Sequence, residues 1–80
     1  MMESLDGKIA LVTGGGTGIG RAAAIALADR GATVIVAGRR QEPLDEVVTL
    51  IGDSASAITA DLADPDDTER LAREVLAQHG

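Results

Sequence analysis

The chain is 80 residues long, carries a formal net charge of −6, and contains no Phe, Tyr, Trp or Cys. This length accommodates one small domain or part of a larger one, whose core must consist of aliphatic side chains without support from disulfides. The acidic balance argues against nucleic acid as a partner, because phosphate backbones are bound by basic faces. The N-terminus lacks a secretory pattern and the apolar runs are too short to cross a bilayer, so we expect a cytoplasmic protein without a membrane partner.

Short segments with the composition of buried strands recur along the chain. Residues 8–13 and 33–37 are rich in β-branched side chains and are flanked by glycine, which is typical of strands in a parallel sheet. Residues 55–60 predict a weaker strand that depends mainly on Ile58.

Helical patterns fill the intervals between these strands. A helix is expected from about residue 18 to residue 30, where Gly31 is a suitable terminating residue. A second helix, with Pro43 near its start and Gly52 after its end, is indicated by apolar residues at the spacing of one helical face, namely Leu44, Val47, Val48 and Ile51.

The last helix is expected to begin at residues 64–67, which read Asp-Pro-Asp-Asp. This segment offers an N-cap, a proline at the first helical position, and two acids that face the positive end of the helix dipole. Capping explains these aspartates better than a metal site does. Glu69 and Arg73 have the spacing of an i,i+4 ion pair, and the apolar stripe consists of Leu71, Ala72, Val75 and Leu76.

The alternation of strands and helices predicts an α/β fold. Because strands joined by helices form parallel sheets with right-handed crossovers, we expect a Rossmann-type βαβαβα half with a three-stranded parallel sheet in the order 3-2-1 and flanking helices. Residues 1–80 would then be a single, partial dinucleotide-binding domain. The first strand would have an open edge, which invites pairing with another chain, and we predict self-association or a homo-oligomer through that edge.

The most specific segment is Thr-Gly-Gly-Gly-Thr-Gly-Ile-Gly at residues 13–20, between the first strand and the first helix. A helix that begins directly after a glycine turn presents free backbone N–H groups and a partial positive charge, which attract the phosphates of a nucleotide. The spacing of Gly14, Gly18 and Gly20 provides a tight turn, a close backbone approach to a pyrophosphate, and helix packing on a strand.

Two other glycine motifs do not fit. A P-loop requires Lys-Ser or Lys-Thr where the chain has Arg21-Ala22, and no three glycines have the G-x-G-x-x-G spacing. A glycine-rich loop without a ligand and a methyltransferase-type nucleotide site remain as alternatives.

With Thr13 in front of these glycines, the segment resembles the Thr-Gly-x-x-x-Gly-Ile-Gly motif of the classical short-chain dehydrogenase/reductase family, and the resemblance extends from residue 7 to residue 80. It implies a nicotinamide dinucleotide as the cofactor and an oxidoreductase that moves hydride between that cofactor and a carbonyl or alcohol. It also implies that Thr13 ties the turn to the sheet. The residues that would line the phosphates and ribose are Gly14, Gly16, Thr17, Gly18, Ile19 (through its N–H) and Gly20.

The end of the second strand bears on which nicotinamide cofactor is bound. An NAD site has an acidic residue there, about 20 residues beyond the glycines, to bind the ribose hydroxyls, whereas this chain has Arg39 and Arg40. A guanidinium suits a 2′-phosphate, which it binds with two charge-assisted hydrogen bonds. We therefore expect NADP rather than NAD, with Arg40 either stacked on the adenine or facing water. The alternative is that both arginines only solvate a turn.

Asp61 and Leu62 follow the third strand. The resemblance implies that Asp61 accepts a hydrogen bond from the adenine amino group and that the backbone N–H of Leu62 contacts the ring. The alternative is that Asp61 is a turn residue without a ligand role.

No catalytic residue is assigned. The family uses a downstream Ser and a Tyr-x-x-x-Lys pair, but this chain has no Tyr and its only Lys is Lys8. His79 is its only histidine and has no acid–base partner in a defined site. We expect the N-terminal, NADP(H)-binding segment of a short-chain dehydrogenase/reductase, inactive by itself. The alternative is a non-catalytic nucleotide-binding or self-associating module.

Overall fold

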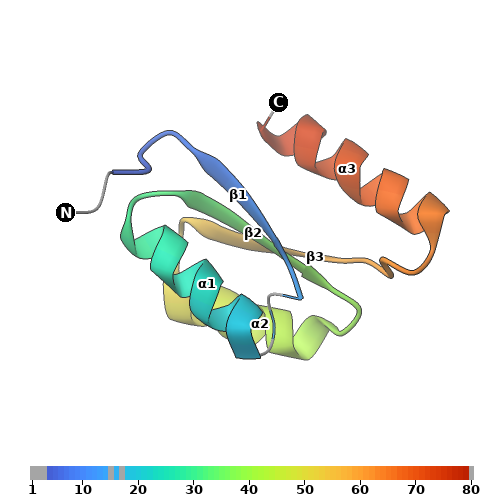
Figure 1. Cartoon of the computed structure of the whole chain (residues 1–80), viewed down its shortest axis with the longest axis horizontal. Helices are drawn as coiled ribbons and strands as arrows, with labels where there is room; N and C mark the ends of the chain where they lie inside the picture. The colour runs from blue at the N-terminus through green and yellow to red at the C-terminus, as the bar shows by residue number, and fades with distance from the viewer. Residues whose placement is uncertain (1–3, 15, 17, 80) are drawn as a thin grey trace.

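The computed structural model of the chain describes residues 4–14, 16 and 18–79. Strands and helices alternate as the sequence predicts (Figure 1). The elements are β1 (Ile9–Thr13), α1 (Gly18–Asp29), β2 (Thr33–Gly38), α2 (Gln41–Ile51), β3 (Ala55–Thr59) and α3 (Pro65–His79). The strands are parallel and lie in the order β1-β2-β3, which confirms the expected Rossmann-like arrangement.

The central strand β2 forms the middle of the core. Its residues Val34, Ile35, Val36 and Ala37 are all fully buried. Because successive side chains of a strand point to opposite faces, Val34 and Val36 pack with α1 and α2 on one face, while Ile35 and Ala37 pack toward α3 on the other. Figure 1 shows the same layers, with α1 and α2 together on one side of the sheet and α3 on the opposite side.

The helix α2 covers the first of these faces with its apolar side. Leu44 and Val47 are buried in the core, and Val48 and Ile51 pack against it, so the predicted apolar face is confirmed. The helix ends at Ile51, and the N–H of the following residue, Gly52, donates to the carbonyl of Val48 over 2.8 Å.

The start of α3 shows the predicted cap. The Asp64 carboxylate accepts a hydrogen bond from the Asp66 N–H over 3.0 Å, and the helix begins at Pro65. The predicted apolar stripe is only partly correct, because Leu71 is buried whereas Leu76 is 67% exposed. The buried side of α3 contacts residues from β2, β3 and the residue after β3, so the other half of the stripe has no sheet beneath it.

The same geometry leaves part of β1 uncovered. Leu11 pairs with Ile35 in the β1–β2 register, and therefore faces the α3 side of the sheet, as does Ile9. Their side chains are 43% and 45% exposed, respectively. Within the part of the chain that the structure describes, β1 pairs only with β2, so its other edge presents unpaired backbone groups.

The longest helix, α3, has 15 residues. Among the described residues, no helix combines the length and the hydropathy that a membrane crossing requires.

Substitution of Leu44 by Ala tests the importance of the α2 face. Leu44 is 1% exposed, so we expect its truncation to lower the free energy of unfolding by about 2–5 kcal/mol through lost apolar burial and the cavity left behind. Urea denaturation followed by circular dichroism measures this change. Leu50→Ala on the same helix is the matched control, because Leu50 is 58% exposed and should change stability by no more than about 0.5 kcal/mol. Equal effects of the two substitutions would contradict this description of the core.

Candidate functional site

The candidate site lies where the three parallel strands end. Because the carboxyl ends of parallel strands meet at one edge of the sheet, the segments after β1, β2 and β3 come together there. These segments carry Gly14, Arg39 and Asp61, respectively. The structure thus brings together the glycine turn, the arginine pair and the aspartate that the sequence analysis selected.

The glycine turn joins β1 to α1 through conformations that favour glycine. Gly14 has a φ of 68° and Gly18 a φ of 50°, both in the left-handed region where a side chain is strained. The N–H of Gly14 donates to the carbonyl of Ala37 over 2.8 Å, which anchors the turn to the end of β2. Thr13 is the last residue of β1 and lies opposite Ala37 in the β1–β2 register, and its expected role in tying the turn to the sheet stays a prediction.

Gly16 is required for a different reason. A Cβ atom placed on Gly16 would lie 2.7 Å from the Cβ of Pro43 and 3.3 Å from the backbone nitrogen of Leu44. The turn therefore packs directly on the first turns of α2, and a side chain at this position would push the two segments apart. At Gly14 and Gly18 the equivalent position has no neighbour within 4 Å among the described atoms, which leaves open space beside the turn.

The start of α1 has features that suit an anion. Its first turn contains no acidic side chain, so nothing there offsets the positive end of the helix dipole. Ile19 has an exposed side chain and Gly20 is half-buried. Thr17, which we also expected to contact the cofactor, lies outside the described residues.

Adjoining hollows occupy this edge of the sheet. We call the first the turn hollow; it measures about 310 Å³ and is lined by Gly14, Gly16, Gly38, Arg39, Arg40, Pro43 and Leu44. The central hollow measures about 380 Å³ and is lined by Gly14, Gly38, Arg39, Ala60, Asp61, Leu62 and Ala63. The outer hollow measures about 270 Å³ and is lined by Arg39, Thr59, Ala60, Asp61, Asp67 and Arg70. Arg39 belongs to all of them and therefore lies at the centre of the site.

The turn hollow is electropositive on one side. Arg39 and Arg40 are exposed, and no ion pair joins either of them to a carboxylate within the described residues. Arg40 is also the N-cap of α2 and makes no side-chain hydrogen bond to that helix, so the first N–H groups of α2 lack a side-chain cap there. Glu42 in the first turn of α2 partly offsets this positive charge.

Asp61 is half-buried after β3, and one of its carboxylate oxygens is already used. Its Oδ1 accepts a hydrogen bond from the N–H of Ala63 over 3.0 Å, the pattern of an Asx turn. Its Oδ2 accepts no hydrogen bond from the residues that the structure describes. The turn role and a ligand role are therefore compatible. Leu62 is 41% exposed and supplies an apolar wall of the central hollow.

Asp67 and Arg70 support this turn from α3, a role that was not predicted from the sequence. The N–H of Asp61 donates to Oδ2 of Asp67, while Nε of Arg70 donates to Oδ1 of Asp67 over 2.8 Å. The hydrogen bond from Arg70, and after it the one from the Asp61 N–H, hold the pKa of Asp67 below its usual value. The hydrogen bonds of Arg70 to Asp67 and to Glu74 raise the pKa of Arg70. Asp67, which we expected to act only on the helix dipole, is thus bound to the turn after β3.

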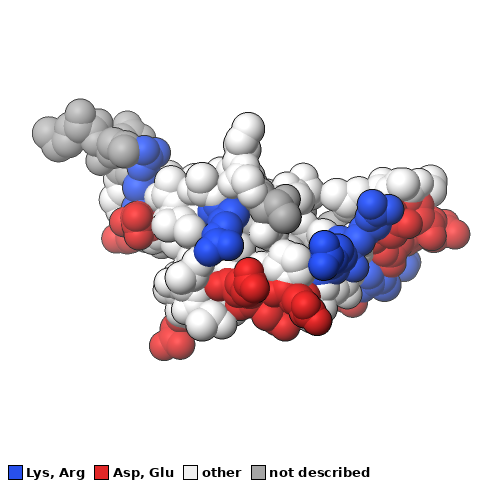
Figure 2. Space-filling model, turned by 90° about the horizontal axis from the view of Figure 1, so that it is seen from below, with Lys and Arg blue, Asp and Glu red and all other residues white. Residues whose placement is uncertain are grey.

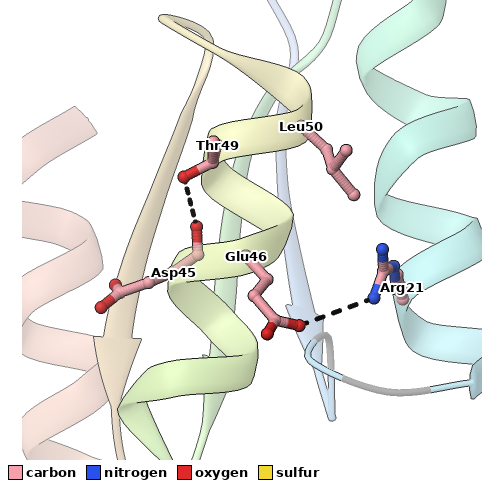
Figure 3. A pocket seen from close by; sticks show the side chains of 5 residues that line it. All are labelled: Arg21, Asp45, Glu46, Thr49 and Leu50. Atoms are coloured by element: carbon pink, nitrogen blue, oxygen red, sulfur yellow. Dashed lines mark hydrogen bonds and ion pairs between the residues drawn. The ribbon is translucent and has the colours of Figure 1, made fainter.

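A further hollow, of about 380 Å³, lies between α1 and α2 (Figure 3). It contains an ion pair of 3.8 Å between Arg21 and Glu46. The Thr49 hydroxyl donates to the Asp45 carbonyl of its own helix over 2.9 Å, and Leu50 forms an apolar part of the wall. Its charged side chains already have partners, Arg21 with Glu46 and the Asp45 carboxylate with Nε2 of Gln41 over 2.6 Å, so it offers fewer free contacts to a ligand than the strand ends do. On the face shown in Figure 2, acidic and basic side chains lie next to one another.

Comparison with known proteins identifies the family. The model of a family described as short chain dehydrogenase matches residues 8–80. The chain belongs to the short-chain dehydrogenase family.

Individual relatives agree with this assignment. Versicolorin reductase 1 of Aspergillus parasiticus is 48% identical over 80 residues, which cover 95% of this chain and 30% of that protein. The citronellol catabolism dehydrogenase AtuB of Pseudomonas aeruginosa has 37% identity and a TM-score of 0.94, with coverage of 100% of this chain and 35% of that one. A 3-ketoacyl-(acyl-carrier-protein) reductase of Brucella melitensis, solved in complex with NADH, has 36% identity and a TM-score of 0.91, with coverage of 96% and 32%. The chain therefore spans about a third of the length of these proteins.

The pKa of Asp67 leads to a prediction on the pH dependence of stability. Because the hydrogen bonds to Arg70 and to the Asp61 N–H hold this pKa below its usual value, ionised Asp67 stabilises the fold above about pH 4, and this contribution is lost as the pH falls through the folded-state pKa. Asp67→Asn should therefore have a lower thermal midpoint than the unmodified chain near neutral pH, and the two midpoints should converge in acid. Thermal denaturation by circular dichroism across this range measures the difference, with Asp53→Asn in an exposed turn as control. A difference that stays constant with pH would contradict the assigned cause.

Proposed function

We propose that this chain is the NADP(H)-binding segment of a short-chain oxidoreductase. The observation that carries the proposal is the position of Arg39, which lines both the turn hollow and the central hollow together with Gly14 of the glycine turn. A pyrophosphate would be bound by backbone N–H groups at the start of α1, in the open space beside Gly14 and Gly18.

The turn hollow would take the 2′-phosphate of the cofactor. Arg39 and Arg40 line it, and a guanidinium binds phosphate through two parallel hydrogen bonds. The uncapped start of α2 adds a partial positive charge to the same wall. The relative from Brucella melitensis was solved with NADH, which shares the adenosine and the diphosphate of NADPH, so the arginine pair is our reason for proposing the phosphorylated cofactor.

The central hollow would take the adenine. The exposed Leu62 side chain provides apolar contact, and the free Oδ2 of Asp61 can accept a hydrogen bond from the 6-amino group. When bound, the nicotinamide cofactor supplies hydride chemistry. The chain contains no Tyr, so we propose that it contributes binding and orientation of the cofactor, while the parent protein of such a segment acts on a carbonyl or alcohol.

Arg39→Ala tests the assignment of the 2′-phosphate. We expect the unmodified chain to bind 2′,5′-ADP more tightly than 5′-AMP. The substitution should reduce this preference by about ten- to hundredfold, which is the contribution of a charge-assisted hydrogen bond to affinity. Titrations followed by NMR measure both dissociation constants even when binding is weak. Arg73→Ala on α3 is the matched control, because Arg73 is exposed and lies on a different face.

An unchanged preference in Arg39→Ala would show that the arginines only solvate the turn. No binding of either nucleotide by the unmodified chain would overturn the proposed function itself.

We also propose that the 80-residue chain associates with a second copy through β1. The supporting observation is that Ile9 and Leu11 remain about half exposed on a strand whose outer edge has no pairing partner within the described residues. Pairing of two such edges would satisfy their backbone groups and bring Ile9 and Leu11 beside side chains on the same face of the second copy, which reduces their exposure.

Leu11→Lys tests this association. A charge on the uncovered face of β1 should oppose the approach of a second sheet, so we expect the unmodified chain to form dimers or larger species and the variant to shift toward the monomer. Light scattering coupled to size-exclusion chromatography measures the masses. Leu50→Lys is the control, since Leu50 is exposed on α2, away from β1. A monodisperse monomer of the unmodified chain would contradict the proposal.

A further inference from the structure

The turn after β3 is held in place from α3 rather than by its own residues alone. Within the turn, the Asp61 carboxylate accepts the N–H of Ala63, and the N–H of Asp64 donates to the Asp61 carbonyl over 3.0 Å. These local bonds define the shape of the turn. Its position relative to the strand ends depends on the N–H of Asp61, which donates to the carboxylate of Asp67 in the first turn of α3.

Arg70 fixes that carboxylate relative to the sheet. Its Nε donates to Asp67 over 2.8 Å and its Nη1 to Glu74 over 2.9 Å, both within α3. Its Nη2 donates to the carbonyl of Thr59, at the end of β3, over 2.7 Å. A single guanidinium thereby connects the last residue of β3 with the helix residue that binds the backbone of Asp61.

The contact with Thr59 lies on the open edge of the sheet. The next residue, Ala60, donates its N–H to Gly38 on the β2 side over 2.8 Å. The Thr59 carbonyl and the Ala60 N–H belong to one trans peptide group and point in opposite directions, so the carbonyl points away from β2, where it accepts the hydrogen bond from Arg70. Few other contacts place α3 on the sheet, since its buried apolar residues are Leu71 and, in part, Val75.

Asp67 and Arg70 do not line the central hollow themselves, whereas Asp61 and Leu62 do. Asp67 and Arg70 line the outer hollow, which shares Arg39, Ala60 and Asp61 with the central hollow. The hydrogen bond from the Asp61 N–H to Asp67 links them to a residue that lines the place where the proposed function puts the adenine.

We infer that Asp67 and Arg70 are positioning residues that determine base recognition by aiming the free carboxylate oxygen of Asp61 into the central hollow. This inference rests on the proposed function. A carboxylate oxygen accepts a hydrogen bond from the 6-amino group of adenine but finds only another acceptor on the 6-oxo group of hypoxanthine. The site therefore distinguishes adenine from hypoxanthine only while the Asp61 carboxylate is held in place.

The test compares NADP with its deamino analogue, in which hypoxanthine replaces adenine. Both ligands carry the same 2′-phosphate and diphosphate, so a general weakening of the site affects them equally, and the ratio of their dissociation constants isolates base recognition. We expect the unmodified chain to prefer NADP by at least about tenfold, the effect of a hydrogen bond to a charged group.

Asp67→Ala and Arg70→Ala should each reduce this preference to less than about threefold. Each should also preserve the preference for 2′,5′-ADP over 5′-AMP that depends on Arg39. The matched control is Arg73→Ala, an exposed arginine on the same helix, which should leave both preferences unchanged. If circular dichroism shows that Arg70→Ala does not fold, the same ratio of dissociation constants is measured for Arg70→Lys, which should also lose the preference for NADP. Lysine keeps the charge but has one donor nitrogen and cannot reproduce the planar fork that reaches Thr59, Asp67 and Glu74.

Several outcomes would overturn the inference. Equal weakening of both ligands in Asp67→Ala and Arg70→Ala, with the ratio retained, would show that these residues support the fold alone. Equal affinity of the unmodified chain for NADP and its deamino analogue would show that Asp61 does not read the base, while the Arg39-dependent preference for the 2′-phosphate would still support the proposed function. Failure to bind either ligand would overturn both.

Discussion

The parallel pairing of β1 with β2 is the constraint on which the site depends. This register places Thr13 opposite Ala37, and the hydrogen bond from the next residue, Gly14, to Ala37 extends the pairing into the turn. The glycine turn and the segment that begins at Arg39 are therefore held at the same level of the sheet. If the pairing slipped by one residue, the core side chains of β1 would face the opposite side and the turn would lose its anchor.

Close packing then decides how near the two phosphate-binding segments can come. Gly16 lies so close to Pro43 that a Cβ atom would not fit, and α2 is in turn fixed by the burial of Leu44 and Val47. The proposed pyrophosphate and 2′-phosphate contacts thus rest on one rigid unit made of the turn and α2. A rigid unit of this kind suits a ligand whose phosphates are carried by the same ribose, because little ordering of the protein is required on binding.

The adenine side is organised differently. There, α3 has few apolar contacts with the sheet, and the polar network of Asp67 and Arg70 sets the position of the turn after β3. Hydrogen bonds to charged groups have stricter geometry than apolar contacts, so this network can orient the turn where the packing of α3 alone would not. The uncovered side chains of β1 follow from the same limited coverage by α3.

The sequence by itself determined the elements and the residue types at the strand ends, because these are local properties. Apolar periodicity located α2, the aspartate and proline located the start of α3, and the glycine spacing indicated a phosphate turn after β1. The spacing of Asp67, Arg70 and Glu74 could also have suggested their ion pairs. Only the tertiary structure decided that Gly16 touches Pro43, that Arg70 reaches Thr59, and that Leu76 has no sheet beneath it. The first two contacts join residues that are distant in the chain, and the exposure of Leu76 depends on how far α3 extends over the sheet. Strand register and helix packing determine both, and no local sequence pattern encodes them.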